Sequence, residues 1–343
     1  MTPADSVAQM PAVGVDMGGT KILAAVVDAR GKIRARVKMP TQAEDGADAV
    51  VKRVAKSVLA VIEESRLTLN DIGAMGISIP CPVDPAVGFV ENAVNLGWLN
   101  FPAKKKLEKA IGRPIWLEND VNAGTYGEFR YGAAQGRQDV FGIFAGTGIG
   151  GGVIIGGRMH RGFNKTSGEV GHIIMKVDGP VQGGGFPGTF EALASRTALT
   201  KWLTKQIEKK GRKSALKKAM KDEKKKGAKG VRIRSGMIKD AAEAGDKVVL
   251  EGLERTARIL GMAASSIIHV LGPEMVVMGG GLMEACGPFL MPTIKKTVEQ
   301  FTFEIERRNV DVVMAQLGDD AGILGAAAIA RDEMALSTAK PAK

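Results

Sequence analysis

The feature of this sequence that most constrains its fold is a pattern that occurs twice, once near the start and again from Phe141. Each copy reads as an apolar strand, a tight turn of glycine and threonine, and a second apolar strand. When Gly14 is aligned with Gly142, Gly18 falls on Gly146. Two copies in 343 residues predict two related lobes that offer their first hairpin turns to a shared cleft, although two unrelated glycine-rich hairpins would give the same pattern.

The rest of the chain alternates between short β-branched runs and longer stretches with helical periodicity. Residues 47–64 and 253–270 carry apolar side chains at the spacing of a helix that is buried on one face. Alternation of this kind is typical of an α/β protein.

The net charge of +11 comes from one segment. Residues 201–234 hold fifteen Lys or Arg against three acids, a local balance of +12 that leaves the rest of the chain near −1. Trp202 is the only aromatic residue in this segment, so a platform for stacking bases is not evident and we expect no nucleic-acid partner. A solvated helix-loop-helix insertion explains the charge, with an electrostatic funnel for an anionic substrate as the alternative.

Composition also predicts the compartment. Two cysteines, Cys81 and Cys286, do not make a disulfide scaffold and favour a reducing cytoplasm. No apolar run approaches the roughly 20 residues that cross a bilayer, and the first residues do not read as a signal peptide, so we expect no membrane association.

Three glycine clusters are candidate sites for a nucleotide. The first turn contains Gly18, Gly19, Thr20 and Lys21 after Asp16, whose carboxylate could hold hydrated Mg²⁺, although a plain hairpin turn has the same sequence. The second contains Gly146, Thr147 and Gly148; it fits GxGxxG, but a strand follows where a dinucleotide site needs a helix. The third, Gly279, Gly280 and Gly281, lies between a strand and a helix, which suits a base or ribose as well as a tight connection.

Eight motifs occur in order and together resemble the ROK sugar kinases, with bacterial glucokinases the most similar members. They are DMGGTK at 16–21, PCPVD at 80–84, NLGW at 95–98, ENDVNAGTYGE at 118–128, GTGIGGG at 146–152, GEVGH at 168–172, VVMGGG at 276–281 and LGDDAGILGAA at 317–327. The resemblance implies an α/β protein with the two-lobed actin-like ATPase fold, also called ribonuclease H-like, and a ligand cleft between the lobes. It also implies ATP and Mg²⁺ as cofactors.

The resemblance assigns Asp120 as the general base that accepts the proton of the attacking sugar hydroxyl. We expect a strand over 114–117 and a helix after it, a position where an aspartate that only caps the helix would also occur. The hydrogen-bond partners that the resemblance implies for the sugar are Asn95, Asn119, Glu169, His172 and Glu191.

The sequence departs from the family where most members bind a structural zinc. The three cysteine positions after the histidine are replaced by Gln182, Gly184 and Thr189, so we predict no zinc. Phe186, Pro187 and Phe190 are expected to pack this loop instead, and the placement of Glu191 is left open.

We therefore expect a glucokinase that phosphorylates the 6-hydroxyl of glucose, working as a homodimer or larger homo-oligomer. Open alternatives are another hexose (N-acetylhexosamine, mannose or fructose), polyphosphate as donor, and a sugar-responsive transcription regulator, for which too few residues precede the first strand. The predicted domains are a small lobe over 1–120 with a returning helix at about 318–335, a large lobe over 121–317 with the basic insertion 201–234, and a tail over 336–343.

Overall fold

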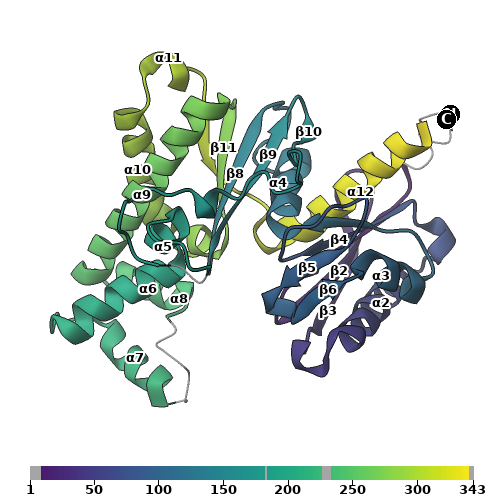
Figure 1. Cartoon of the computed structure of the whole chain (residues 1–343), viewed down its shortest axis with the longest axis horizontal. Coiled ribbons are helices and arrows are strands. Elements are labelled where there is room, and N and C mark those ends of the chain that lie inside the picture. Colours follow the sequence, from purple (N-terminus) through teal and green to yellow (C-terminus); the bar gives the residue numbers. More distant parts are fainter. Residues whose placement is uncertain (1–8, 182–183, 226–232, 340–343) are drawn as a thin grey trace. The chain divides into compact units, whose positions relative to one another are not determined.

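The computed structural model describes residues 9–181, 184–225 and 233–339, which form two compact units (Figure 1). The first unit comprises the residues up to Gln138, Gly152–Gly168 and those from Asp319 onward. The second comprises Asp139–Gly151 and Glu169–Gly318. The first unit thus runs beyond residue 120, and the predicted division of the chain into lobes stays a prediction.

The sheet of the first unit has five strands in the order β3-β2-β1-β4-β7. They are β1 (Ala12–Met17), β2 (Lys21–Val27), β3 (Ile33–Pro40), β4 (Ala74–Ile79) and β7 (Trp116–Asn119). Strand β2 pairs antiparallel with β1 and β3, whereas β4 pairs parallel with β1 and β7. Strands β1, β2 and β3 therefore form an antiparallel meander. Strands β4 and β7 extend the sheet in parallel to β1, and parallel strands need crossover connections, which are usually helices.

Among the residues that the structure describes, the first unit also includes four long helices, a two-stranded hairpin and short turns. They are α2 (Ala47–Glu64), α3 (Ala103–Ile111), α4 (Asp120–Tyr131), α12 (Ala321–Ala339), β5 (Val90–Ala93), β6 (Trp98–Phe101), η1 (Ala43–Asp45), η2 (Leu69–Asp71), η3 (Val94–Leu96) and η6 (Gly318–Asp320). The predicted helix over 47–64 is confirmed. The predicted tail is partly wrong, because α12 continues to Ala339; residues 1–8 and 340–343 lie outside the described residues.

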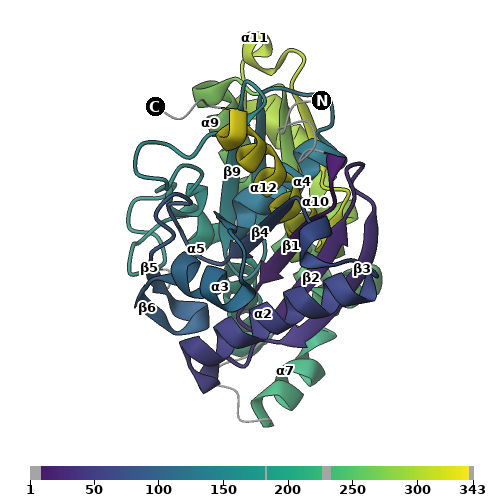
Figure 2. The same cartoon turned by 90° about the vertical axis from the view of Figure 1, so that its right-hand side faces the viewer.

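Helices cover both faces of this sheet. Successive residues of a strand point to opposite faces, so neighbouring residues of β1 contact different helices. Val13 and Val15 of β1 share an apolar core with α2, which Figure 2 shows in front of the strands. Gly14 points the other way, toward α12, where an added Cβ would lie 1.9 Å from the carbonyl oxygen of Ile323. Helix α12 therefore packs on the backbone of β1 itself.

The second sheet repeats the strand order of the first, as β10-β9-β8-β11-β12. Its strands are β8 (Val140–Ala145), β9 (Ile149–Ile155), β10 (Arg158–Met159), β11 (Met275–Gly279) and β12 (Asp311–Met314). Strand β10 and the part of β9 from Gly152 onward belong to the first unit, and the other strands to the second. Strand β11 pairs parallel with β8 and β12, as β4 does with β1 and β7. The repeated order confirms the α/β prediction and the actin-like ATPase fold.

The second unit also contains the chain's longest helices, of which α9 and α10 lie side by side (Figure 1). Its helices and turns are η4 (Val170–His172), α5 (Phe190–Ala194), α6 (Arg196–Thr204), the π-helical turn η5 (Lys205–Lys209), α7 (Leu216–Lys225), α8 (Ser235–Glu243), α9 (Lys247–Leu271), α10 (Gly281–Phe301) and α11 (Glu304–Arg307). Helix α9 contains the predicted helix over 253–270.

The basic segment 201–234 forms the end of α6, η5, α7 and the approach to α8, and residues 226–232 lie outside the described residues. Leu216 and Met220 of α7 are buried while the lysines around them are exposed. Among residues 9–181, 184–225 and 233–339, no helix has both the length and the apolar character to span a bilayer.

Candidate functional site

The start of α4 places the candidate base. Strand β7 ends at Asn119 and α4 begins at Asp120, two residues later than the strand predicted over 114–117. Asn119 caps the helix: its Oδ1 accepts hydrogen bonds from the backbone N–H groups of Val121 and Asn122 at 2.9 and 3.0 Å. The alternative that Asp120 is the N-cap residue is therefore wrong.

Two hydrogen bonds hold one oxygen of the Asp120 carboxylate. Its Oδ1 accepts from the backbone N–H of Val121 at 2.9 Å and from Nδ2 of Asn119 at 3.1 Å. The negative charge of Asp120 also acts on the buried thiol of Cys81. Burial, and secondarily this charge, raise the pKa of Cys81 to about 12. Cys81 is therefore a packing residue, as expected, and not a thiolate nucleophile.

A buried ion pair between Glu118 and Arg161 stabilises the start of α4. Glu118 is 1 % exposed, and its Oε1 accepts from the backbone N–H of Asn119 at 3.1 Å and from Nδ2 of Asn122 at 3.0 Å. Its Oε2 accepts from Nε of Arg161 at 2.8 Å, and Arg161 also contacts Glu333 of α12 at 3.0 Å. A buried carboxylate needs this compensation, so the pair holds the residues on both sides of Asp120.

Asp16 ends β1 beside the first glycine turn. Oγ of Ser78 donates to its Oδ1 at 2.9 Å, because Asp16 and Ser78 are register partners on β1 and β4. Burial raises the pKa of Asp16, while the Ser78 hydrogen bond and the charge of Lys21 partly oppose the rise. Lys21 lies 3.3 Å from Asp319, which follows α10 and β12 in the chain. A carboxylate held in this way is a suitable ligand for Mg²⁺.

The first turn closes with a hydrogen bond from the N–H of Gly18 to the carbonyl of Lys21 at 2.9 Å. Thr20 is exposed at its tip. An added Cβ at Gly19 would lie 2.8 Å from the carbonyl oxygen of Asn95, so glycine is required there for close approach of two backbone segments. The structure thus brings Asn95 next to this turn.

The second turn closes with a hydrogen bond from the N–H of Gly146 to the carbonyl of Gly148 at 2.9 Å. Glu191 of α5 lies against it: its Oε2 accepts from the N–H of Ile149 at 2.9 Å, and an added Cβ at Gly148 would lie 2.3 Å from that oxygen. The placement of Glu191, which the sequence left open, is therefore on the second turn.

Glu169 and His172 lie at the two ends of η4, with Nε2 of His172 3.5 Å from Oε2 of Glu169. Burial raises the pKa of Glu169; the positive form of His172 opposes this, and the like charge of Glu191 adds to it. Three of the five predicted sugar partners thus form one cluster in the second unit, while Asn95 and Asn119 belong to the first.

The third glycine cluster has the predicted strand-turn-helix context. Gly279 ends β11, Gly280 has φ +87°, and Gly281 begins α10. An added Cβ at Gly280 would also lie 2.7 Å from the carbonyl oxygen of Ala145. Close packing alone therefore explains glycine at 280.

The loop that replaces the zinc motif holds together by other means. Oγ1 of Thr189 accepts from the N–H of Ala192 at 3.2 Å and caps α5, and Phe190 is fully buried. The expectation that Phe186 packs this loop is wrong, because it is 59 % exposed. Gln182 lies outside the described residues; within those that are described, no group of three or more His, Cys, Asp or Glu could hold a metal ion, and the absence of zinc stays a prediction.

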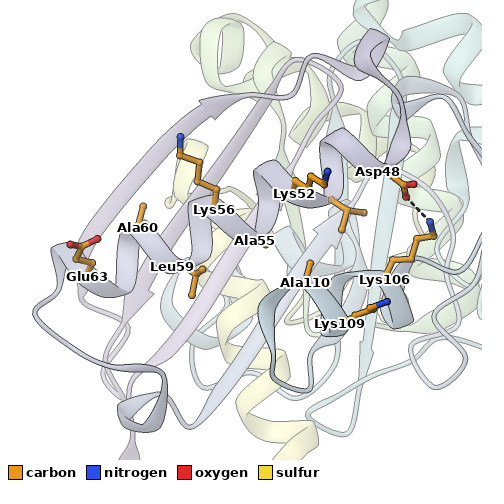
Figure 3. A pocket seen from close by; sticks show the side chains of 11 residues that line it. Asp48, Lys52, Ala55, Lys56, Leu59, Ala60, Glu63, Lys106, Lys109 and Ala110 are labelled. Carbon is orange, nitrogen blue, oxygen red and sulfur yellow. Dashed lines mark hydrogen bonds and ion pairs between the residues drawn. The ribbon is translucent and has the colours of Figure 1, made fainter.

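A groove of about 820 Å³ between α2 and α3 (Figure 3) lies elsewhere in the first unit. Its floor includes Leu59 and Ala110, its edges carry lysines, and Lys106 pairs with Asp48 at 2.6 Å. Among the described residues, none of the predicted site residues lines it.

Several residues of the site were missed by sequence reasoning. Ser78, Glu118, Arg161 and Arg196 act through contacts with residues far away in the chain. Of these four, only Glu118 lay within a motif that was singled out. Register between β1 and β4 was the one signal that could have found Ser78.

Comparison with known proteins identifies the family. The ROK family profile matches residues 12–333. A glucokinase from Streptomyces coelicolor is 34% identical over 321 residues, 93% of this chain and 97% of that protein, and one from Thermotoga maritima is 33% identical over 323 residues, 94% and 98%. The crystal structure of a ROK family glucokinase from Streptomyces griseus in complex with glucose and AMPPNP has 33% identity and a TM-score of 0.77, covering 94% of this chain and 99% of that one. This chain belongs to the ROK family.

Proposed function

We propose that the protein is an ATP-dependent glucokinase that transfers the γ-phosphate to the 6-hydroxyl of glucose. The observation that carries the proposal is Asp120, a half-buried carboxylate at the first turn of α4 whose Oδ1 is fixed by the N–H of Val121. The glucokinases of Streptomyces coelicolor and Thermotoga maritima, and the glucose and AMPPNP in the Streptomyces griseus structure, support the choice of sugar and donor.

In the proposed reaction, Asp120 accepts the proton of the sugar hydroxyl as its oxygen attacks the γ-phosphorus. The new phosphorus–oxygen bond forms while the bond to the β-phosphate oxygen breaks, and ADP leaves with that electron pair. A fixed carboxylate suits this role, because proton transfer needs the base within hydrogen-bond reach of the hydroxyl.

The glycine turns would bind the phosphates through backbone N–H groups and through the hydroxyls of Thr20 and Thr147. Both threonines are exposed at the tips of their turns. Gly279, Gly280 and Gly281 would lie against the base or ribose.

Asp16 would hold Mg²⁺, directly or through water. The chemistry fits, because Ser78 orients the carboxylate and a nearby cation would favour the ionised form that burial disfavours. When bound, Mg²⁺ would neutralise negative charge on the transferred phosphate.

The sugar would be held by the five predicted partners: Asn95, Asn119, Glu169, His172 and Glu191. Carboxylates, an amide and an imidazole can each match a particular hydroxyl, and a site built to bond a hydroxyl discriminates against sugars that lack it. We also propose a cytoplasmic homodimer or larger assembly, which light scattering of the purified protein would test.

A panel of hexoses, each assayed with ATP and with polyphosphate in the presence of Mg²⁺, tests the proposal. We expect the highest kcat/KM with glucose and ATP. A preference for N-acetylhexosamine, mannose or fructose would change the substrate, and a preference for polyphosphate would change the donor. No phosphate transfer to any hexose would refute the kinase and favour a sugar-responsive regulator.

A further inference from the structure

Arg196, the first residue of α6, makes a set of contacts to the second glycine turn that the predicted site does not include. Its Nη2 donates to Oγ1 of Thr147 at 2.5 Å, and its backbone N–H donates to the carbonyl of Gly146 at 2.9 Å. The next residue, Thr197, donates its hydroxyl to the carbonyl of Thr147 at 2.7 Å. The start of α6 is thus bonded to both of the first two residues of the turn.

The two hairpins differ in where their positive charge comes from. The strand after the first turn begins with Lys21, and the strand after the second begins with Ile149. The second turn therefore has an apolar residue where the first carries a positive charge. Arg196, 50 residues beyond Gly146, supplies a guanidinium to the second turn from another element.

The hydrogen bond also fixes what the Thr147 hydroxyl can do. An oxygen that accepts from a guanidinium keeps its own hydrogen for donation to a further acceptor. Thr147 is exposed and Arg196, which donates to its hydroxyl, is half-buried, so a ligand can reach the threonine from solvent. A polarised donor backed by a positive charge matches a phosphate oxygen.

We propose that Arg196 is a positioning residue for the donor phosphates: it holds Thr147 as a hydrogen-bond donor and adds positive charge to a site for a phosphoanhydride chain. This rests on the proposed use of the second turn for a nucleoside triphosphate. Nη1 of Arg196 also lies 3.5 Å from Oγ of Ser235, a second contact of the guanidinium.

The test is a set of binding titrations on the full-length protein with ATP, adenosine and inorganic tripolyphosphate. The variants are Arg196→Gln, Arg196→Lys and Lys201→Gln, which removes an exposed charge from the same helix as a matched control. We expect Arg196→Gln to weaken ATP binding about tenfold, as loss of a charge-assisted hydrogen bond does, with adenosine binding unchanged. Arg196→Lys should restore part of the affinity, and Lys201→Gln should change it less than about twofold.

Each outcome decides the inference. Equal affinity of wild type and Arg196→Gln for ATP would overturn it, as would an equal loss of adenosine binding, which would show a structural role for α6. If wild type binds neither ATP nor tripolyphosphate, the inference also fails. A tenfold loss with tripolyphosphate but no binding of ATP supports Arg196 and changes the donor. A protein that binds ATP as expected but phosphorylates no hexose refutes the proposed function alone.

Discussion

In the first unit the glycine turn is packed against the chain's own backbone, whereas the turn of the second unit faces side chains and open space. A Cβ at Gly19 would strike the carbonyl of Asn95 at 2.8 Å. A Cβ at Gly146 would have no described neighbouring atom within 4 Å, and one at Gly148 would lie 2.3 Å from the Glu191 carboxylate. Two turns that look alike in sequence therefore differ in packing: Gly19 and Gly148 are enclosed by other parts of the chain, whereas packing does not explain glycine at 146.

The largest expected effect is on turnover, and it comes from changing the proposed base, which lies in neither glycine turn. Asp120→Asn should lower kcat by about 10²–10⁴, because the amide cannot accept the hydroxyl proton, while the Kd for glucose changes little. Steady-state kinetics and a glucose titration measure the two quantities. Asp48→Asn, an exposed change on α2, is the control. Full turnover in Asp120→Asn would remove this residue from its role.

The comparison of the turns is tested by adding one methyl group to each. Gly19→Ala should lower the free energy of unfolding by about 1–3 kcal/mol, because it overpacks two backbone segments. Gly146→Ala should leave the free energy of unfolding nearly unchanged but weaken ATP binding. Denaturant unfolding and ATP titration of both variants give the result. If Gly146→Ala binds ATP like wild type, no ligand approaches that turn closely.

A smaller effect is expected on the acidity of Glu169. Glu191→Gln should lower the pKa of Glu169 by removing a like charge, and His172→Gln should raise it by removing a positive one. Because burial raises this pKa in the folded protein, the protonated form stabilises the fold, and that contribution is lost as pH rises through the raised value. Carboxyl NMR titrations would measure the pKa of Glu169, and an unchanged pKa in both variants would show that the three groups do not interact.

The last prediction is that removing metal ions does not change the thermal stability. Treatment with a zinc chelator should leave Tm unchanged, since we predict no zinc and the Thr189 cap and the buried Phe190 stabilise the start of α5. Elemental analysis of the untreated protein provides the second measurement. One zinc per chain, or a lower Tm after chelation, would contradict the prediction.

Local patterns predicted much of this fold, because helical spacing and glycine turns act over a few residues. The helix over 47–64 and the strand-turn-helix at Gly279–Gly281 follow from such signals. The identity of the capping residue did not, since Asn119 and Asp120 are both good caps and one residue decides between them.

The site was predicted only where its residues lie in motifs. Arg161 reaches Glu118 from 43 positions away and Arg196 reaches Thr147 from 49, and no single sequence marks such partners. The pKa of a carboxyl group cannot be predicted from sequence either. The pKa of Asp16 is raised by burial under segments whose position the sequence does not give. Phe186 and Phe190 show the same limit, since one is exposed and the other buried four residues later.

The packing of α12 has a consequence for the order in which the protein is made. Helix α12 lies on the backbone of β1 at Gly14 and of β4 at Gly76, and an added Cβ at Gly322 would lie 3.0 Å from Cγ of Asp16. It follows the whole of the second unit in the chain. During synthesis, the strands of the first unit therefore leave the ribosome long before the helix that covers them. The face of β1 and β4 that α12 covers therefore stays without its helix until the last part of the chain has been made.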